Sequence, residues 1–286
     1  MNQAARPQVA FLLILLMSGW ILLQMGLVVF HQISDVRYDG NLPIYLVDLF
    51  TDIWSRHSVF KMVFTCLLII TITRICFFIG KQAFLDHKWH SIVQNRKNDA
   101  LSIEINASYK HLRTEIIVIQ EHKPVALTKG IWHARIVIST GLLHLLSNSE
   151  VEAVLIHEQY HRLCRHPFKK CLIHLFCFSM NYIPALGALR SYFDVCIEIL
   201  ADKHVINEMN STYPLSSALL KMVNSRKQSF KSTAVQFTDG EAINYRLSQL
   251  IEPDHPIKVP LFSLQTSLFS ISMLIGMFII VTLKCI

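Results

Sequence analysis

The sequence predicts an α+β membrane protein in which one polar domain is flanked by transmembrane helices. Hydrophobic residues make up 52% of the 286 residues, which is a high share for a soluble domain. Several uncharged stretches reach the length of about 20 residues that a helix needs to cross a bilayer. Between these stretches, runs of β-branched residues predict a small sheet, and apolar residues at helical spacing predict helices.

Two stretches near the amino terminus are predicted to cross the membrane. Residues 9–30 contain no charge, and their apolar run is longer than that of a cleaved signal peptide. Residues 58–80 contain only Lys61 and Arg74, each towards one end, where a long cationic side chain can reach the interface. Basic residues follow the second stretch, which places that side in the cytoplasm. We expect residues 1–80 to form two transmembrane helices joined by a short outer loop.

The remaining apolar segments differ in their predicted topology. Residues 261–283 carry no charge and predict a final span within the carboxy-terminal segment 261–286. Residues 171–189 are also uncharged, but the acidic residues beyond them must return to the polar domain if they act there. We therefore expect a buried or re-entrant helical hairpin. It belongs to one cytoplasm-facing domain, residues 81–260.

The polar domain is predicted to contain two strands followed by helices. β-branched residues dominate residues 115–120 and 135–139, and this composition predicts strands. Residues 140–146 predict a short helix. Ser147 can then cap a longer helix, with Glu150 completing a capping box.

The longer helix carries the sequence His157-Glu158-Gln159-Tyr160-His161. Its two histidines lie one turn apart on one face, so both imidazoles can bind a single metal ion. Glu158 lies between them, close enough to polarise a water bound to the metal. A catalytic zinc site needs a third protein ligand and keeps its fourth position open for water. In a chain with 14 histidines the pattern can also arise by chance, so it needs support from elsewhere in the sequence.

A pair of acidic residues further along the chain can supply the missing ligand. Glu198 and Asp202 lie one helical turn apart and share a face. Glu198 can complete a zinc site with the two histidines, and Asp202 can accept a hydrogen bond from the far nitrogen of a liganding histidine. The alternative is an ordinary solvent-exposed helix face. The order of the two motifs, separated by one apolar segment, favours a site that binds one zinc ion per chain.

With these motifs in place, residues 125–207 resemble the integral-membrane metallopeptidases of the BlaR/MecR type. The similarity covers the strand at residues 135–139, the metal-binding helix at residues 152–161 and the acidic motif at residues 198–202. The resemblance implies a gluzincin-like zinc metallopeptidase domain with a small sheet and active-site helices. It also implies that the active site faces the cytoplasm at a bacterial cell membrane.

The resemblance assigns roles to individual residues. By similarity, His157, His161 and Glu198 bind one Zn²⁺, and Glu158 is the catalytic base. The best-known members are β-lactam sensor-transducers, with three spans before the zinc domain and a large penicillin-binding domain after the last span. This chain has two predicted spans before that domain and ends at Ile286. We therefore expect no β-lactam-sensing role.

The expected activity is the hydrolysis of peptide bonds in a protein or peptide substrate. The resemblance implies regulated proteolysis in signal transduction, by cleavage of a transcriptional repressor or of the protein itself. An HtpX-like or CAAX-processing protease is the alternative, although those proteins place two full spans between motifs that are 37 residues apart here. A non-catalytic membrane signalling protein is a further alternative, but it would have no use for Glu158 as a base.

The substrate and the membrane are the expected partners. An extended substrate is expected to pair with the second strand as an added edge strand, through Arg135, Ile136, Val137 and Ile138. Candidates for stabilising the oxyanion are Tyr182, His204 and Arg246. The formal net charge of +7 is spread beside apolar spans, which indicates anionic lipid headgroups as the binding partner. We expect no direct binding of nucleic acid.

Overall fold

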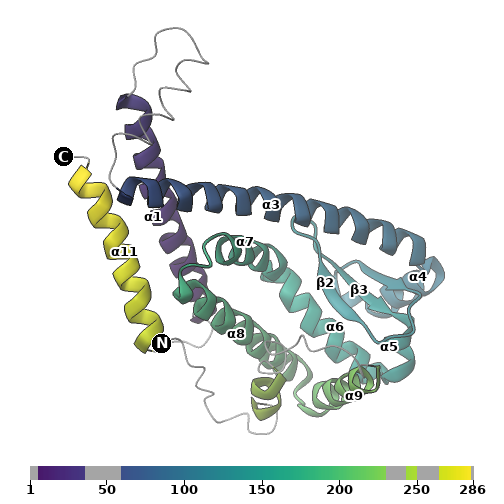
Figure 1. The fold of residues 1–286 in the computed structure, drawn as a ribbon. Coiled ribbons are helices and arrows are strands. Elements are labelled where there is room, and N and C mark those ends of the chain that lie inside the picture. Colours follow the sequence, from purple (N-terminus) through teal and green to yellow (C-terminus); the bar gives the residue numbers. More distant parts are fainter. Residues whose placement is uncertain (1–5, 36–58, 230–242, 250–263, 285–286) are drawn as a thin grey trace. The chain divides into compact units, whose positions relative to one another are not determined.

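The computed structural model of the protein describes residues 6–35, 59–229, 243–249 and 264–284 (Figure 1). The chain divides into two compact units, which are described separately. The polar unit contains Met1–Gln8, Gln82–Leu172 and Ser191–Pro260, and the apolar unit contains Val9–Lys81, Ile173–Arg190 and Leu261–Ile286. The predicted boundaries at residues 80 and 260 stay a prediction.

The apolar unit contains long helices at the positions of the predicted spans. Helix α1 (Arg6–Asp35) and helix α3 (Val59–Arg96) cover the two amino-terminal stretches. By length and composition, two described helical segments could cross a membrane, Pro7–Phe30 and Thr65–Arg96. Helix α11 (Leu264–Lys284) lies at the predicted third span, and its apolar part within the described residues is shorter.

The apolar segment at residues 171–189 forms a helical hairpin. Helix α7 (His166–Ser179) is followed by a short turn, and helix α8 (Pro184–Met209) begins at a proline, a residue that suits the first helical position. The Cys177 thiol donates to the carbonyl of Leu186, 3.2 Å away, and so joins the two helices near the turn. The predicted hairpin is thus present, and its place in the bilayer stays a prediction.

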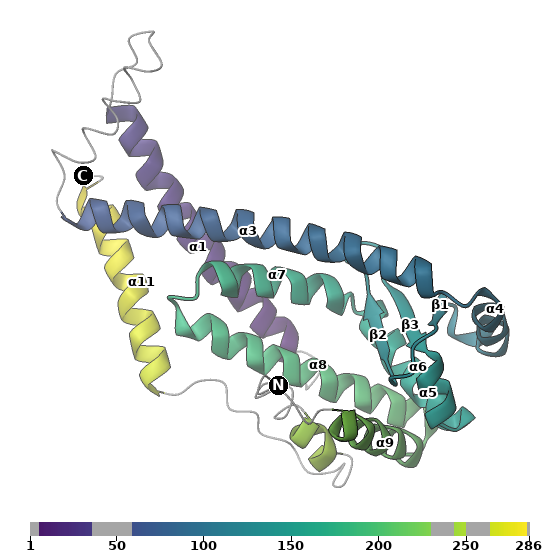
Figure 2. The same ribbon diagram turned by 45° about the vertical axis from the view of Figure 1, so that its right-hand side comes forward.

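A three-stranded sheet lies in the polar unit (Figure 2). The strands are β1 (Ile116–Ile119), β2 (Ala126–Lys129) and β3 (Arg135–Ser139), in the spatial order β1-β3-β2. β3 pairs with β1 in parallel and with β2 in antiparallel orientation. The strands predicted at residues 115–120 and 135–139 are therefore confirmed, whereas β2 was not predicted.

The position of β3 corrects the predicted substrate-binding strand. Because β3 lies between β1 and β2, its backbone groups on both sides are already paired, and no substrate strand can be added to it. Ile136, Val137 and Ile138 are at most 2% exposed, and Arg135 forms an ion pair with Glu115 at 3.0 Å. The prediction that a substrate strand pairs with the backbone of these four residues is therefore wrong, and the edge next to the site belongs to β2.

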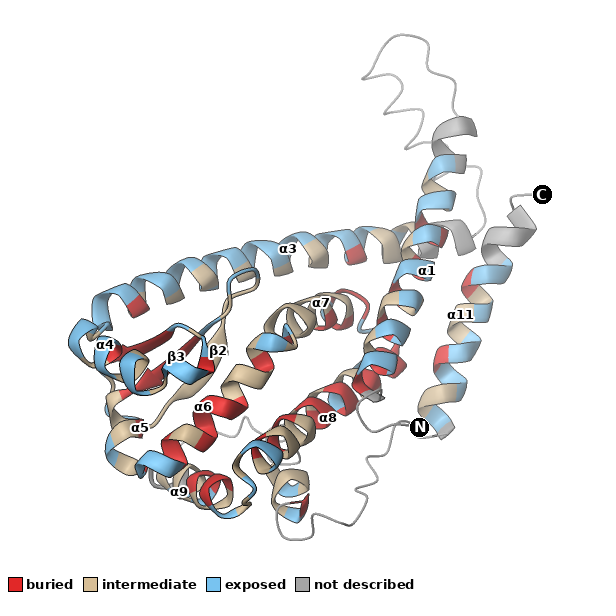
Figure 3. Cartoon of the chain, turned by 180° about the vertical axis from the view of Figure 1, so that it is seen from behind, coloured by how far each residue is buried: buried red, intermediate tan, exposed pale blue. Residues whose placement is uncertain are grey.

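The polar unit also contains the helices α4 (Asp99–Ser108), η2 (Lys110–Leu112), α5 (Thr140–Leu145), α6 (Asn148–Leu163) and α9 (Tyr213–Ser229). α6 contacts β2 and β3 and also packs against α9. Figure 3 shows buried residues along α6. Leu155 of α6, Ile138 of β3 and Leu142 of α5 are fully buried in one hydrophobic cluster. Burial of each such side chain stabilises the fold by about 1.5–3 kcal/mol, so α6 is fixed firmly on the sheet.

The amino-terminal end of α6 is held by the predicted capping box and by α9. The Ser147 N–H donates to Glu150 Oε2 at 2.8 Å. Glu150, which is 3% exposed, also accepts hydrogen bonds from Ser217 Oγ at 2.5 Å and Lys221 Nζ at 2.8 Å. A single carboxylate therefore caps α6 and joins it to α9.

This carboxylate is expected to make stability depend on pH. Burial alone would raise the pKa of Glu150, but the bonds from Lys221, Ser217 and Ser147 lower it from 4.5 to about 2. Because the folded pKa lies below the unfolded one, the stabilisation is present above pH 4.5 and is lost as the pH falls towards 2. In thermal unfolding of the detergent-purified protein, Glu150→Gln should reduce the change in the free energy of unfolding across this pH range by about 1–2 kcal/mol. Glu104→Gln, at an exposed helix position, is the control, and equal pH profiles for all three proteins would contradict this account.

Candidate metal centre

Three side chains from two helices converge in the polar unit. α6 carries His157 and His161 one turn apart on its buried face, and α8 brings Glu198 opposite them. His157 and His161 are 6% and 7% exposed, so both imidazoles are held in place by packing. Among the described residues, this is the one group of three or more His, Cys, Asp or Glu side chains arranged so that they could hold a metal ion.

The distances between the ligand atoms fit a zinc ion. His157 Nε2 lies 3.1 Å from His161 Nε2 and 3.3 Å from Glu198 Oε2, and His161 Nε2 lies 3.6 Å from the same oxygen. Zinc bonds of about 2.0–2.1 Å at the tetrahedral angle place neighbouring ligand atoms about 3.3–3.4 Å apart. The three atoms therefore have the spacing of three corners of a zinc tetrahedron, which leaves the fourth position for water or substrate.

Asp202 and Arg246 support this site from behind. Asp202 is fully buried, and its Oδ1 lies 3.0 Å from His157 Nδ1, so the opposite nitrogen of that imidazole faces the ligand cluster. Arg246, in the helical residues 243–249, donates from Nε to Asp202 Oδ2 at 2.7 Å and from Nη2 to Oδ1 at 2.8 Å. This two-pronged ion pair fixes the carboxylate that orients His157.

The charges around His157 favour a cation at its Nε2. Burial and the guanidinium of Arg246 lower the pKa of His157, but the contacts with Asp202 and Glu198 outweigh them and raise it to about 9. Burial raises the pKa of Glu198, yet His161, His157 and Lys170 hold it well below its ordinary value. Of these two carboxylates, Glu198 lies at Nε2 and would stabilise a metal ion there, whereas Asp202 lies at Nδ1.

His166 orients the second histidine ligand. Its Nδ1 lies 2.7 Å from His161 Nδ1, and it is 5% exposed. Burial and the neighbouring His161 and Lys169 lower the pKa of His166 to about 3, so the ring is neutral and one nitrogen can accept. With the proton on His161 Nδ1, the lone pair of His161 Nε2 points to the ligand cluster.

The sequence pattern does not predict this role of His166. Between α6 and α7 the chain turns at Arg165, whose φ of 52° ends the helical spacing. The periodicity of α6 therefore gives no signal for a contact between His161 and His166.

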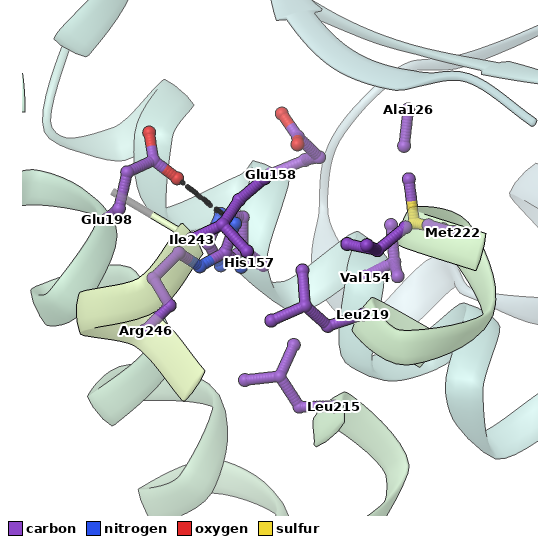
Figure 4. A pocket seen from close by; sticks show the side chains of 11 residues that line it. Ala126, Val154, His157, Glu158, Glu198, Leu215, Leu219, Met222, Ile243 and Arg246 are labelled. Atoms are coloured by element: carbon purple, nitrogen blue, oxygen red, sulfur yellow. Dashed lines mark ion pairs between the residues drawn. The ribbon is translucent and has the colours of Figure 1, made fainter. Parts of the chain in front are cut away.

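Glu158 lies between two hollows beside the ligand cluster. The Thr128 hydroxyl of β2 lies 2.8 Å from Glu158 Oε2 and can donate to it. One hollow, of about 210 Å³, has charged groups on one side and apolar side chains on the other (Figure 4). Its apolar residues include Val154, Leu215, Leu219, Met222 and Ile243. A second hollow, of about 200 Å³, lies along β2 and the start of α7 and is lined by His161, Pro167 and Lys170.

The structure separates the three residues predicted as oxyanion stabilisers. Tyr182 belongs to the apolar unit, where its hydroxyl lies 3.1 Å from Thr71 Oγ1. His204 packs on the ring of Tyr160, with ring centres 5.0 Å apart. Arg246 lines the hollow beside Glu158, and its Nη1 lies 3.6 Å from Glu198 Oε2. Of the three, Arg246 is the residue that lies at the cluster.

Comparison with known proteins agrees with this geometry. The sequence model of Peptidase family M48 matches residues 90–253, which is more than half of the 286 residues and includes both motifs. No curated protein matches the chain. The match supports a membrane-type zinc metallopeptidase and does not confirm the BlaR/MecR type.

Proposed function

The chain belongs to peptidase family M48, and from this premise we propose that it is a zinc endopeptidase embedded in the cell membrane, with its active site facing the cytoplasm. The observation that carries the proposal is the tetrahedral spacing of His157 Nε2, His161 Nε2 and Glu198 Oε2. Two helices with the length and composition of membrane spans support the location. The basic residues that follow the predicted second span support the orientation.

The residues around the cluster can carry out peptide hydrolysis. A zinc ion held by the three ligands would lower the pKa of a water molecule and polarise the scissile carbonyl. Glu158 is placed to take the proton of the attacking water and to pass it to the leaving amine nitrogen. The Thr128 hydroxyl keeps the carboxylate of Glu158 at the cluster, and Arg246 keeps Asp202 against His157.

The substrate backbone pairs with β2 in this proposal. β2 is an edge strand whose partner β3 covers one side, and Ala126, Leu127 and Thr128 line the hollow next to Glu158. An extended peptide that adds to this edge passes the ligand cluster. The apolar hollow of about 210 Å³ is smaller than the roughly 300–1,000 Å³ of pockets for drug-sized ligands. It has room for one apolar side chain of the substrate.

Regulated cleavage of one protein, such as a transcriptional repressor or the protein itself, is the role we propose. The observation that favours it over HtpX-like turnover of membrane proteins is the length of α7 between the two motifs: its 14 residues are fewer than the about 20 that a full span needs. A stable substrate-trapping variant, Glu158→Gln, should retain one main protein in cells under this proposal. Retention of many unrelated membrane proteins would favour turnover instead.

Metal removal tests the enzymatic activity directly. The detergent-purified full chain is expected to cleave an unfolded protein such as casein, to lose this cleavage on treatment with a zinc chelator, and to regain it when zinc is added back. Recovery with zinc but not with magnesium is expected, because imidazole ligands suit zinc. Cleavage that persists after complete metal removal would contradict the proposal.

A further inference from the structure

A third hollow lies beyond the ligand cluster, next to the second one. Its volume is about 440 Å³, and it lies between the β2–β3 turn and the end of α6. It shares Pro167 with the hollow that contains His161 and Glu158. The third hollow therefore adjoins the second at Pro167, and the second adjoins the first at Ala126, Glu158 and Glu198.

Positive charge dominates this third hollow. Three arginines line it, Arg135, Arg162 and Arg165, against one carboxylate, Glu115. Glu115 is paired with Arg135 at 3.0 Å, so it does not offset the other two. Arg162 donates to the carbonyl of Ala134 at 3.1 Å, and this neutral acceptor does not neutralise its positive charge. The Arg165 side chain is exposed and has no ion-pair partner among the described residues.

Arg165 follows α6 in a left-handed backbone conformation, and an aromatic pair lies beside it. Its φ is 52°, in the left-handed region where a helix usually ends in glycine because glycine has no Cβ. An arginine at this position is less favourable for the backbone than glycine. In the same hollow, Trp132 is 82% exposed and faces Phe168, with ring centres 5.6 Å apart. An apolar surface therefore lies beside the unpaired guanidinium of Arg165.

We propose that this third hollow, with Arg165 at its rim, binds an acidic side chain of the peptide substrate and so selects peptides that are acidic before the scissile bond. The inference rests on the proposed peptidase function. From Thr128, whose hydroxyl lies 2.8 Å from Glu158 Oε2, to Gly130 at the hollow is two residues, or about 7 Å of extended chain. An antiparallel partner of β2, the more stable of the two pairings, runs its residues before the scissile bond in this direction. The acidic residue is then the second before the cleaved bond.

Two variants test the proposal, each placing glycine at a left-handed backbone position that glycine tolerates. Arg165→Gly removes the charge and also relieves the left-handed backbone. Arg113→Gly is the matched control, since Arg113 is also exposed, also has a positive φ of 47°, and lines none of the three hollows. The substrates are two peptides with blocked termini that differ only in aspartate or asparagine at the second position before the cleaved bond. The readout is the ratio of their kcat/KM values in the full, zinc-loaded chain.

The wild-type chain and Arg113→Gly are expected to cleave the aspartate peptide about fivefold better than the asparagine peptide, an advantage that falls with added salt. Arg165→Gly should bring this ratio to about one. An equal ratio in the wild type and Arg165→Gly would overturn the inference while cleavage itself upholds the proposed function. Zinc-dependent cleavage of neither peptide would instead count against the proposed function. If Arg165→Gly leaves the ratio unchanged but weakens binding of anionic lipid in phosphatidylglycerol nanodiscs, the hollow serves lipid and the inference is wrong.

Discussion

Replacing Glu158 with glutamine is expected to lower kcat for peptide cleavage about 1,000-fold while the chain keeps its full zinc content. The carboxylate is the group that takes and returns the proton, and general acid–base catalysis is worth about 10²–10⁴ in rate. Glutamine has nearly the same shape and can still meet the Thr128 hydroxyl, which lies 2.8 Å from Glu158 Oε2. The ligands His157 and His161 are unchanged, so metal binding should not suffer.

Glu152→Gln is the matched control for this change. Glu152 lies on the same helix, five residues before His157, and its partly exposed carboxylate is 3.4 Å from His111 Nε2. Its replacement should leave both kcat and zinc content unaltered. A zinc-loaded Glu158→Gln variant with wild-type kcat would show that another group is the base.

Replacing Asp202 with alanine is expected to destabilise the protein by about 3–5 kcal/mol and to weaken zinc binding about 10–100-fold. Asp202 is fully buried and pairs with Arg246 through two bonds of 2.7 and 2.8 Å. Its removal leaves the guanidinium of Arg246 largely buried without its main partner. It also removes the group that holds His157 by its Nδ1.

Denaturant unfolding in detergent and a zinc competition titration measure these two effects. Asp202→Asn keeps the shape and a hydrogen-bond acceptor, so its loss of stability should lie between that of the alanine variant and the wild type. Asp99→Ala, at a carboxylate that is 76% exposed, should cost less than about 1 kcal/mol. An Asp202→Ala variant as stable as Asp99→Ala would contradict the role of the buried ion pair.

The local elements of the polar unit could be predicted because their signals are local. The β-branched runs gave β1 and β3, and Ser147 with Glu150 marked the start of α6. β2 has only Thr128 as a β-branched residue, so its propensity gives no strand signal. It becomes a strand through its pairing with β3, and this long-range contact decided which strand offers a free edge.

The site could be predicted where one helix sets the spacing. His157 and His161 lie on one turn, and the distance from Asp202 to His157 agrees with the expected support of a ligand. The partner of Asp202 could not be predicted, because Arg246 lies 44 residues further along the chain and only the fold brings them together. For the same reason Arg246 was expected near the oxyanion, whereas the structure ties its guanidinium to Asp202.

The zinc content of the detergent-purified chain, measured for the wild type beside Glu198→Ala, tests the central claim most directly. We expect about one zinc ion per wild-type chain and less than about a tenth of that in the variant, because two imidazoles alone do not close a zinc site. A folded wild-type chain without zinc would contradict the account of a metallopeptidase. Full retention of zinc by Glu198→Ala would contradict the three-ligand cluster.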